Sequence, residues 1–223
     1  MDIRSIKMID AYKDLAAIFA SHGFSLYLVG GTVRDYLLDI SLTDLDAVSE
    51  ATPDKIKEMF PLADYTFERF GSVKLHYQGY KFDITTLREE KGYKDYRHPG
   101  SIVFVDSLKK DVKRRDFTIN ALYMDKDLKV IDYVDGVKDL KEKRIAMIGD
   151  SKTRIQEDPL RIIRAMRFMT NLDFKLDNVL YISIKNNKEL LKNITPAKIE
   201  MEIKKANNPE KLLKSLKDLD IMW

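Results

Sequence analysis

Two aspartates separated by a single residue, Asp44 and Asp46, follow a glycine turn and an arginine near the start of the chain. Residues i and i+2 of a strand project from the same face, so both carboxylates are expected side by side. Carboxylates held together repel one another unless a cation lies between them, and Mg²⁺ takes oxygen ligands while keeping sites for water and phosphate. We therefore expect Asp44 and Asp46 to bind metal and to be catalytic.

The glycine turn itself is Leu28-Val29-Gly30-Gly31-Thr32-Val33-Arg34-Asp35. Gly30 and Gly31 permit a close backbone approach to an anion, and Arg34 adds a bidentate phosphate donor. Asp83, in a later strand-like run, is a candidate third catalytic carboxylate. Taken alone, the aspartate pair is more typical of a solvated strand edge, and the glycine pair of a tight turn with a surface arginine. Their combination predicts metal-assisted transfer of a nucleotide.

The composition excludes several other classes of protein. The chain has 223 residues with 44% apolar residues, which is enough for a core. It has no cysteine, which excludes disulfides and thiolate metal sites. The N-terminal segment lacks the apolar stretch of a signal peptide, and no run approaches the roughly 20 apolar residues of a membrane span, so we expect a cytoplasmic location. The net charge of +3 points to no partner, although residues 109–115 and 154–167 are locally basic.

Hydrophobic periodicity predicts a mixed α/β region followed by helices. We expect an α+β fold, with a catalytic domain over residues 1–148 and a small all-helical domain over residues 149–223. A polar segment over residues 89–100, with Gly92, Pro99 and Gly100, is expected to be a mobile loop. The expected strands are 26–29, 44–48, 72–77 and 81–87, and the expected helices are 5–21, 32–38, 53–60, 159–168, 182–191, 196–206 and 209–219.

Four segments, in this order, carry a resemblance to a known family. They are the glycine turn with Asp44-Leu45-Asp46, then 113–122 (KRRDFTINAL), then Asp135-Gly136 with Asp139-Leu140, then 157–168 (EDPLRIIRAMRF). The chain resembles class II tRNA nucleotidyltransferases and bacterial poly(A) polymerases, of the polymerase-β-like nucleotidyltransferase superfamily, over their head and neck regions. The resemblance implies that head fold, followed by a helical neck.

The resemblance also implies roles for individual residues. Arg115 is expected to contact phosphate and Asp116 the ribose, with Asn120 as a further nucleotide-binding candidate. Asp158 and Arg161 match the pair that reads the base: Asp accepts from an amino group and Arg donates to a ring nitrogen, which fits cytosine and adenine and rejects uracil and guanine. The remaining candidates for nucleotide binding are Glu157, Arg164 and Arg167.

The implied reaction is Mg²⁺-dependent, template-independent addition of C and A from CTP and ATP to the 3′ end of tRNA. An A-adding enzyme and a poly(A) polymerase remain alternatives, as does a non-catalytic nucleotide- or RNA-binding module. Residues 93–99 resemble the flexible loop of enzymes that add the terminal A, with His98 expected to pack within the loop. Family members continue past the point where this chain ends at Trp223, so we expect a fragment, a short form or half of a split enzyme. A protein partner or further domains would then help to hold the tRNA.

Overall fold

The protein is described by a computed structural model that covers residues 2–93 and 99–223. Contacts between residues divide the chain into two compact units. The sheet unit comprises Met1–Glu90, Ile102–Arg115 and Asn120–Gly136, and the helical unit comprises Lys91–Ser101, Asp116–Ile119 and Val137–Trp223. The domain boundary between residues 148 and 149, expected from the sequence, stays a prediction.

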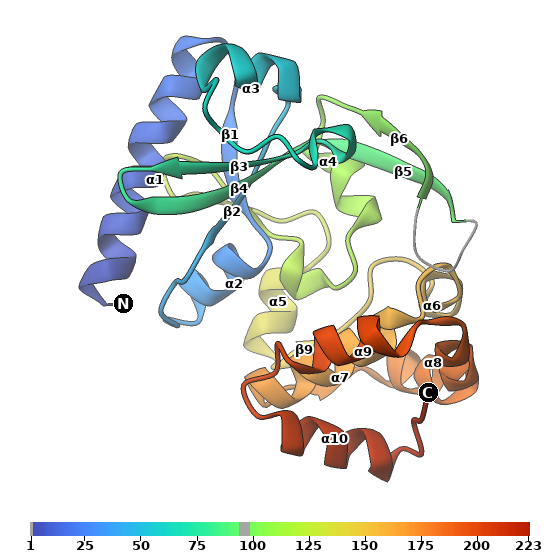
Figure 1. The fold of residues 1–223 in the computed structure, drawn as a ribbon. Helices are drawn as coiled ribbons and strands as arrows, with labels where there is room; N and C mark the ends of the chain where they lie inside the picture. Colours follow the sequence, from blue (N-terminus) through green and yellow to red (C-terminus); the bar gives the residue numbers. More distant parts are fainter. Residues whose placement is uncertain (1, 94–98) are drawn as a thin grey trace. The chain divides into compact units, whose positions relative to one another are not determined.

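The sheet unit is built on one mixed sheet of six strands in the order β3-β4-β2-β1-β7-β8 (Figure 1). Strands β2 and β4 run parallel, whereas the other neighbouring pairs are antiparallel. A mixed sheet with helices is the architecture expected from the sequence. The strands are β1 (Leu26–Val29), β2 (Leu45–Ser49), β3 (Ser72–Tyr77), β4 (Tyr80–Thr86), β7 (Tyr123–Met124) and β8 (Val130–Ile131).

Helix α1 (Ile3–Ser21) covers one side of this sheet and is fixed to it by a buried tyrosine. The Tyr12 hydroxyl lies 2.9 Å from the carbonyl oxygen of Leu26 and 3.0 Å from that of Met124, so it bridges β1 and β7. Burial raises the pKa of Tyr12, which keeps the hydroxyl protonated. The helix ends at Ser21 with His22 as its C-cap, before Gly23 with φ +82°, so it stops where the sequence predicts.

Short helices and a tight turn complete the sheet unit. The turn between β3 and β4 places Gln78 and Gly79 at φ 49° and 80°, which is typical of a two-residue hairpin. The helices and 3₁₀ turns are α2 (Gly31–Leu37), α3 (Pro53–Met59), η1 (Glu68–Phe70), α4 (Leu108–Asp111) and η2 (Val112–Arg114), and η3 (Thr118–Asn120) follows at the edge of the unit.

The prediction of a loop over residues 89–100 is wrong for those residues of the segment that the structure describes. Strands β5 (Arg88–Tyr93) and β6 (Pro99–Phe104) pair there in a two-stranded sheet, and residues 94–98, including His98, lie outside the described residues. The polar sequence concealed the first strand because its charges are paired internally: Nε of Arg88 donates to Oε1 of Glu90 at 2.9 Å.

The helical unit consists mainly of helices packed on α7. Ile162, Ile163 and Met166 of α7 are fully buried. The parallel two-stranded pair β9 (Arg144–Ile145) and β10 (Lys175–Leu176) lies beside it. The helices are α5 (Gly136–Lys141, whose first residue belongs to the sheet unit), α6 (Ser151–Glu157), α7 (Leu160–Leu172), α8 (Asn178–Asn187), η4 (Lys188–Asn193), α9 (Pro196–Ile203) and α10 (Pro209–Asp218).

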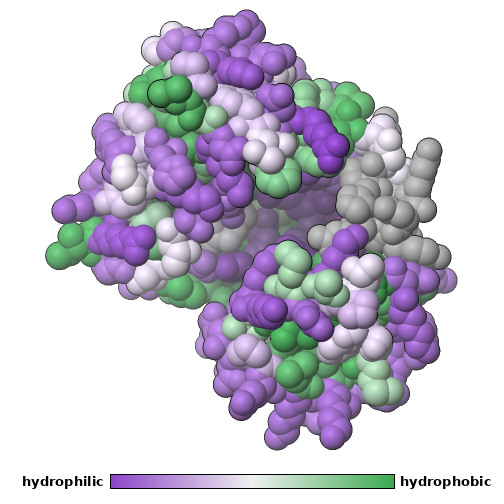
Figure 2. Space-filling view, in the orientation of Figure 1, coloured by the Kyte–Doolittle hydropathy of each residue, from purple (hydrophilic) through white to green (hydrophobic). Residues whose placement is uncertain are grey.

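The outer surface of both units is largely hydrophilic in the view of Figure 2, with apolar side chains in small patches. Among the described residues, no helix combines the length and apolar character needed to cross a bilayer.

Candidate active site

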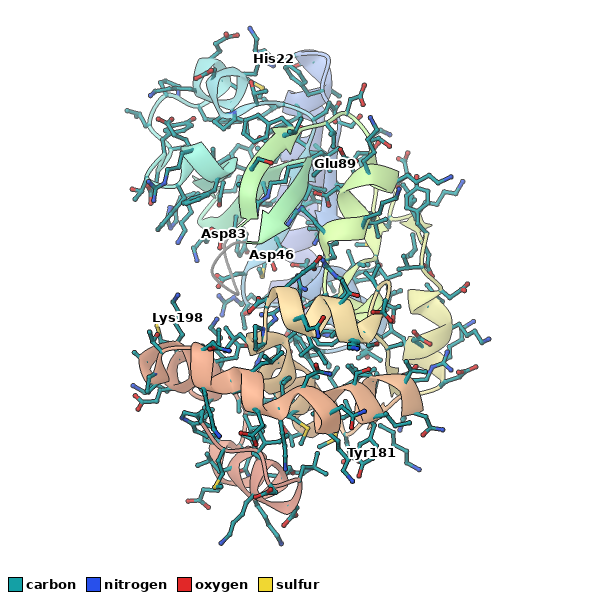
Figure 3. The ribbon with its side chains drawn as sticks, turned by 90° about the vertical axis from the view of Figure 1, so that its right-hand side faces the viewer. His22, Asp46, Asp83, Glu89, Tyr181 and Lys198 are labelled. Atoms are coloured by element: carbon teal, nitrogen blue, oxygen red, sulfur yellow. The ribbon has the colours of Figure 1, made fainter. Side chains whose placement is uncertain are left out.

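Asp46 and Asp83 face each other across two parallel strands. Asp46 of β2 is in register with Asp83 of β4, and side chains opposite each other in a ladder lie on one face of the sheet. Figure 3 labels the two residues side by side on these strands. Asp44 precedes β2 by one residue and is also exposed, with 56% of its side chain accessible. The sheet register therefore brings Asp83 to the expected metal-binding pair.

The electrostatics of Asp46 are those of a crowded carboxylate. Desolvation by the surrounding protein atoms, followed by the negative charge of Asp83, raises the pKa of Asp46 to about 6. The charge of Asp44 acts in the same direction, whereas Arg115 and Lys81 oppose the shift. A divalent cation would relieve this repulsion. Asp83 adds a second observation, because its Oδ1 atom is buried and accepts no hydrogen bond from any described residue.

These carboxylates fit Mg²⁺ by the chemistry of their donors. All offer hard oxygen ligands, which Mg²⁺ prefers, and Mg²⁺ keeps several waters or phosphate oxygens rather than requiring an all-protein cage. Within residues 2–93 and 99–223, no group of three or more His, Cys, Asp or Glu side chains is already placed to hold a metal ion. The site therefore fits an ion that takes part of its ligands from a phosphate or from water.

Thr32, which sequence reasoning did not single out, connects the glycine turn to the aspartates. Its hydroxyl accepts a 2.9 Å hydrogen bond from the backbone N–H of Asp46 and lies 3.4 Å from the carbonyl oxygen of Asp44. Gly30 adopts φ 68° at the start of α2, a conformation that favours glycine, and its N–H donates to the carbonyl of Leu122. Thr32 thus sets the position of the carboxylates relative to the turn.

Arg34 holds other side chains of the protein by its guanidinium. Its Nε and Nη2 atoms donate to Asp35 at 2.9 and 3.0 Å, and its Nη1 atom donates to Oδ1 of Asn120 at 2.5 Å. Only 11% of the Arg34 side chain is exposed. The bidentate face predicted to hold phosphate is therefore occupied by Asp35. Asn120 is itself buried, and its Nδ2 atom has no partner among the described residues.

Arg115 is held beside the glycine turn by a buried aspartate. Its Nε donates to Oδ2 of Asp111 at 3.0 Å and to the Tyr123 hydroxyl at 3.1 Å. A Cβ added to Gly30 would lie 3.9 Å from Nη1 of Arg115, so the guanidinium comes close to the turn. The structure thus brings Gly30, Arg115 and Asn120 together within the sheet unit.

Asp111 is the centre of this arrangement and has no exposed side-chain surface. It accepts hydrogen bonds from Nε of Arg114 at 2.8 Å, from Nε of Arg115, from the Tyr123 hydroxyl at 2.8 Å and from the backbone N–H of Arg88. Burial favours the neutral acid, but the charges of Arg115 and Arg114 and the Tyr123 hydrogen bond lower the pKa of Asp111 to about 2. Asp111 is therefore a buried carboxylate that aligns two arginines.

In the helical unit, Asp116 is engaged by an arginine of α7. Arg164 donates to Oδ2 of Asp116 through Nε at 2.7 Å and also through Nη2. Although burial opposes it, this contact lowers the pKa of Asp116. Nε of Arg167 donates at 2.8 Å to Glu202 of α9, and Nη1 of Arg164 lies 3.6 Å from the same carboxylate. Asp116, Arg164 and Arg167 thus belong to one charged network.

The expected base-reading pair lies at the junction of α6 and α7. Oδ1 of Asp158 accepts from the backbone N–H of Leu160 at 3.1 Å, as a residue before a helix does. Nη1 of Arg161 donates to the carbonyl oxygen of Arg154 at 2.5 Å and to Oε2 of Glu157 at 3.2 Å. Glu157 therefore helps to orient the Arg161 guanidinium.

Asp111, Thr32 and Glu202 were not identified from the sequence. Asp111 lies in a lysine- and arginine-rich run, and its only sequence signal is the i+3 and i+4 spacing to Arg114 and Arg115. The role of Thr32 depends on strand β2 passing beside α2. Glu202 is 35 residues from Arg167, and no local pattern connects them.

Comparisons with known proteins place these features in a family. Residues 26–146 match the model of the poly A polymerase head domain. A CCA-adding enzyme of Lactobacillus helveticus is 46% identical over 183 residues, which cover 82% of this chain and 46% of that protein. The chain thus spans about half the length of such relatives.

Solved structures agree with the sequence comparison. The Bacillus stearothermophilus CCA-adding enzyme in complex with CTP is 33% identical with a TM-score of 0.82, covering 92% of this chain and 48% of that one. The Thermotoga maritima CCA-adding enzyme in complex with tRNA is 27% identical with a TM-score of 0.76, covering 99% of this chain and 52% of that one. The polymerase-β-like head fold predicted from the sequence is therefore confirmed.

Proposed function

This chain belongs to the family of the poly A polymerase head domain, and we propose that it carries the nucleotidyltransferase half of a CCA-adding enzyme. The reaction would be template-independent addition of C and A, from CTP and ATP, to the 3′ end of tRNA. The observation that carries the proposal is the register of Asp46 with Asp83 beside Asp44, next to a glycine turn. The relatives named above are all called CCA-adding enzymes.

The proposed catalytic groups lie in the sheet unit. Asp44 and Asp46 would hold Mg²⁺, with Asp83 as a third carboxylate whose buried Oδ1 has no partner in the described chain. Mg²⁺ bound there would supply charge stabilisation for the attacking 3′ oxygen and for the leaving pyrophosphate. The carboxylate charges disfavour binding of a triphosphate without its divalent ion, because like charges repel at short range.

The triphosphate would be held by the turn and by the groups around it. Gly30 and Gly31 allow close approach of an anion, and Arg115, aligned by Asp111, would donate to phosphate. Asn120 offers a buried amide nitrogen that has no partner in the described part of the chain. Arg34 would act on the nucleotide indirectly, through Asn120, because its Nε and Nη2 atoms donate to Asp35 and its Nη1 atom donates to Asn120.

The proposed nucleotide-selecting groups, Asp116 among them, lie in the helical unit. Asp158 would accept from the amino group of cytosine or adenine, and Arg161, oriented by Glu157, would donate to the neighbouring ring nitrogen. Asp116 would bind the ribose, while Arg164 and Arg167 would add contacts to base or phosphate. Uracil and guanine present the opposite donor pattern on that edge and would be rejected.

The test is single-turnover extension of a tRNA that lacks its 3′ CCA end, with Mg²⁺ and CTP, ATP or both. We expect addition of C, C and then A, and no extension by Asp46→Asn. Asp127→Asn is the matched control, because Asp127 is an exposed aspartate paired with Lys126. A single A added only to a CC-ended tRNA would indicate an A-adding enzyme, and a long A tail with ATP alone would indicate a poly(A) polymerase. Nucleotide binding without extension under any condition would favour the non-catalytic module.

A further inference from the structure

Lys81 shares a face of the sheet with the acidic cluster. It lies on β4 two residues before Asp83, so the two side chains project from the same side of the strand. Its Nζ atom lies 3.8 Å from Oδ2 of Asp44 and 3.5 Å from Oδ2 of Asp83. The ammonium therefore contacts one carboxylate on β4 and another just before β2.

The surroundings of Lys81 are those of a cation site. Three aspartates gather on or just before neighbouring strands, and their like charges repel one another unless a positive charge lies among them. Within the sheet unit, Lys81 contributes a positive charge to this group, and its side chain is 34% exposed. Its flexible stem allows the ammonium to leave without rearrangement of the backbone.

We propose that Lys81 is the resident cation of the Asp44, Asp46 and Asp83 cluster: its ammonium pairs with Asp44 and Asp83 in the metal-free protein and is displaced when a divalent ion binds. The inference rests on the metal site of the proposed function. Lysine and metal then compete for the same carboxylate oxygens. Because of this competition, the site binds metal more weakly than its three carboxylates would without the lysine. A triphosphate would favour metal binding, because its negative charge attracts the displaced ammonium.

Lys74 provides a matched control within the same sheet. It lies on β3 in register with Asp83, so it occupies the same face one strand away. Its Nζ atom, however, lies 5.7 Å from the centre of the Phe67 ring. Lys74→Gln removes the same charge from the same surface as Lys81→Gln, so the difference between the two variants isolates direct competition.

The experiment titrates the protein with Mn²⁺ in the absence of nucleotide and follows the signal of free Mn²⁺ by electron paramagnetic resonance. Removing a positive charge about 4 Å from the bound ion is expected to tighten Mn²⁺ binding by Lys81→Gln on the order of tenfold. Lys81→Arg, which keeps the charge, should bind like the wild type. Lys74→Gln should differ from the wild type by less than about twofold, because the Lys74 ammonium lies against the Phe67 ring and charges at longer range are screened.

The inference is overturned if Lys81→Gln binds Mn²⁺ no more tightly than Lys74→Gln, or more weakly. Lys81→Met replaces Lys81→Gln should the latter lower the melting temperature. The same preparations are assayed for tRNA extension, which separates the two ideas. If the wild type extends tRNA but Lys81→Gln has an unchanged Mn²⁺ affinity, only the role of Lys81 is rejected. If the wild type neither binds Mn²⁺ nor extends tRNA, both the metal site and the role of Lys81 are rejected.

Discussion

Nη1 of Arg34 donates a 2.5 Å hydrogen bond to Oδ1 of Asn120, a residue 86 positions later in the chain. This contact fixes the orientation of the Asn120 amide, so its Nδ2 atom presents a donor that has no partner among the described residues. An arginine expected from the sequence to bind phosphate thus acts on the position of an asparagine.

If Asn120 donates to the nucleotide and Arg34 acts through it, the two residues should behave as one unit. We expect Asn120→Ala to lower kcat/KM for CTP by about 10- to 100-fold, as loss of one buried donor would. Arg34→Lys should lower it to a similar extent, and the double variant should be little worse than either single variant. Single-turnover kinetics across this double-mutant cycle measure the coupling. Additive losses would contradict the positioning role of Arg34.

The buried carboxylate of Asp111 should matter for stability as much as for function. Asp111→Ala removes the buried carboxylate that pairs with Arg114 and Arg115. Breaking such a buried pair lowers the unfolding free energy by about 3–5 kcal/mol. Urea denaturation followed by circular dichroism measures the loss. Asp127→Ala, at an exposed pair, should change the unfolding free energy by less than about 1 kcal/mol. Equal effects of the two substitutions would show that the Asp111 network is not stabilising.

Much of the architecture follows from local sequence, whereas the site depends on register. Strand β1, the β3–β4 turn and the stop of α1 at His22-Gly23 were predictable, because apolar periodicity and glycine act within a few residues. The pairing of Asp46 with Asp83 was not, because it is set by how two parallel strands align. The Arg34 guanidinium donates to the neighbouring Asp35. Which acceptor an arginine binds cannot be predicted from the sequence alone.

The pH dependence of stability should report the crowding around Asp46. A carboxyl whose pKa is raised from 3.8 to about 6 binds its proton more tightly in the folded chain. Its contribution to the unfolding free energy is therefore greatest below pH 3.8 and is lost as the pH rises through 6. Partial exposure of the side chain weakens the effect. In the presence of EDTA, the urea midpoint of the wild type should fall relative to that of Asp46→Asn between pH 4 and pH 7.

The comparison with Asp46→Asn removes the titration of groups away from Asp46, including Asp111, whose lowered pKa acts in the opposite direction at more acid pH. A midpoint difference that is the same at both ends of this range would mean that the pKa of Asp46 is not raised. Addition of Mg²⁺ at neutral pH should reverse the destabilisation in the wild type, since the ion binds the folded protein, and should leave Asp46→Asn almost unchanged.

The orientation of Arg161 by Glu157 leads to a prediction for nucleotide choice. Glu157→Gln removes the charge that holds the guanidinium at 3.2 Å while leaving the side chain's size unchanged. We expect the ratio of kcat/KM for CTP over UTP to fall by about 3- to 30-fold, since a freer Arg161 discriminates less well between an acceptor and a donor on the base. Mn²⁺ affinity should not change, because Glu157 lies outside the acidic cluster of the sheet unit. Glu189→Gln, at an exposed pair with Lys192, is the matched control. Loss of activity with an unchanged CTP-to-UTP ratio would assign Glu157 a purely structural role.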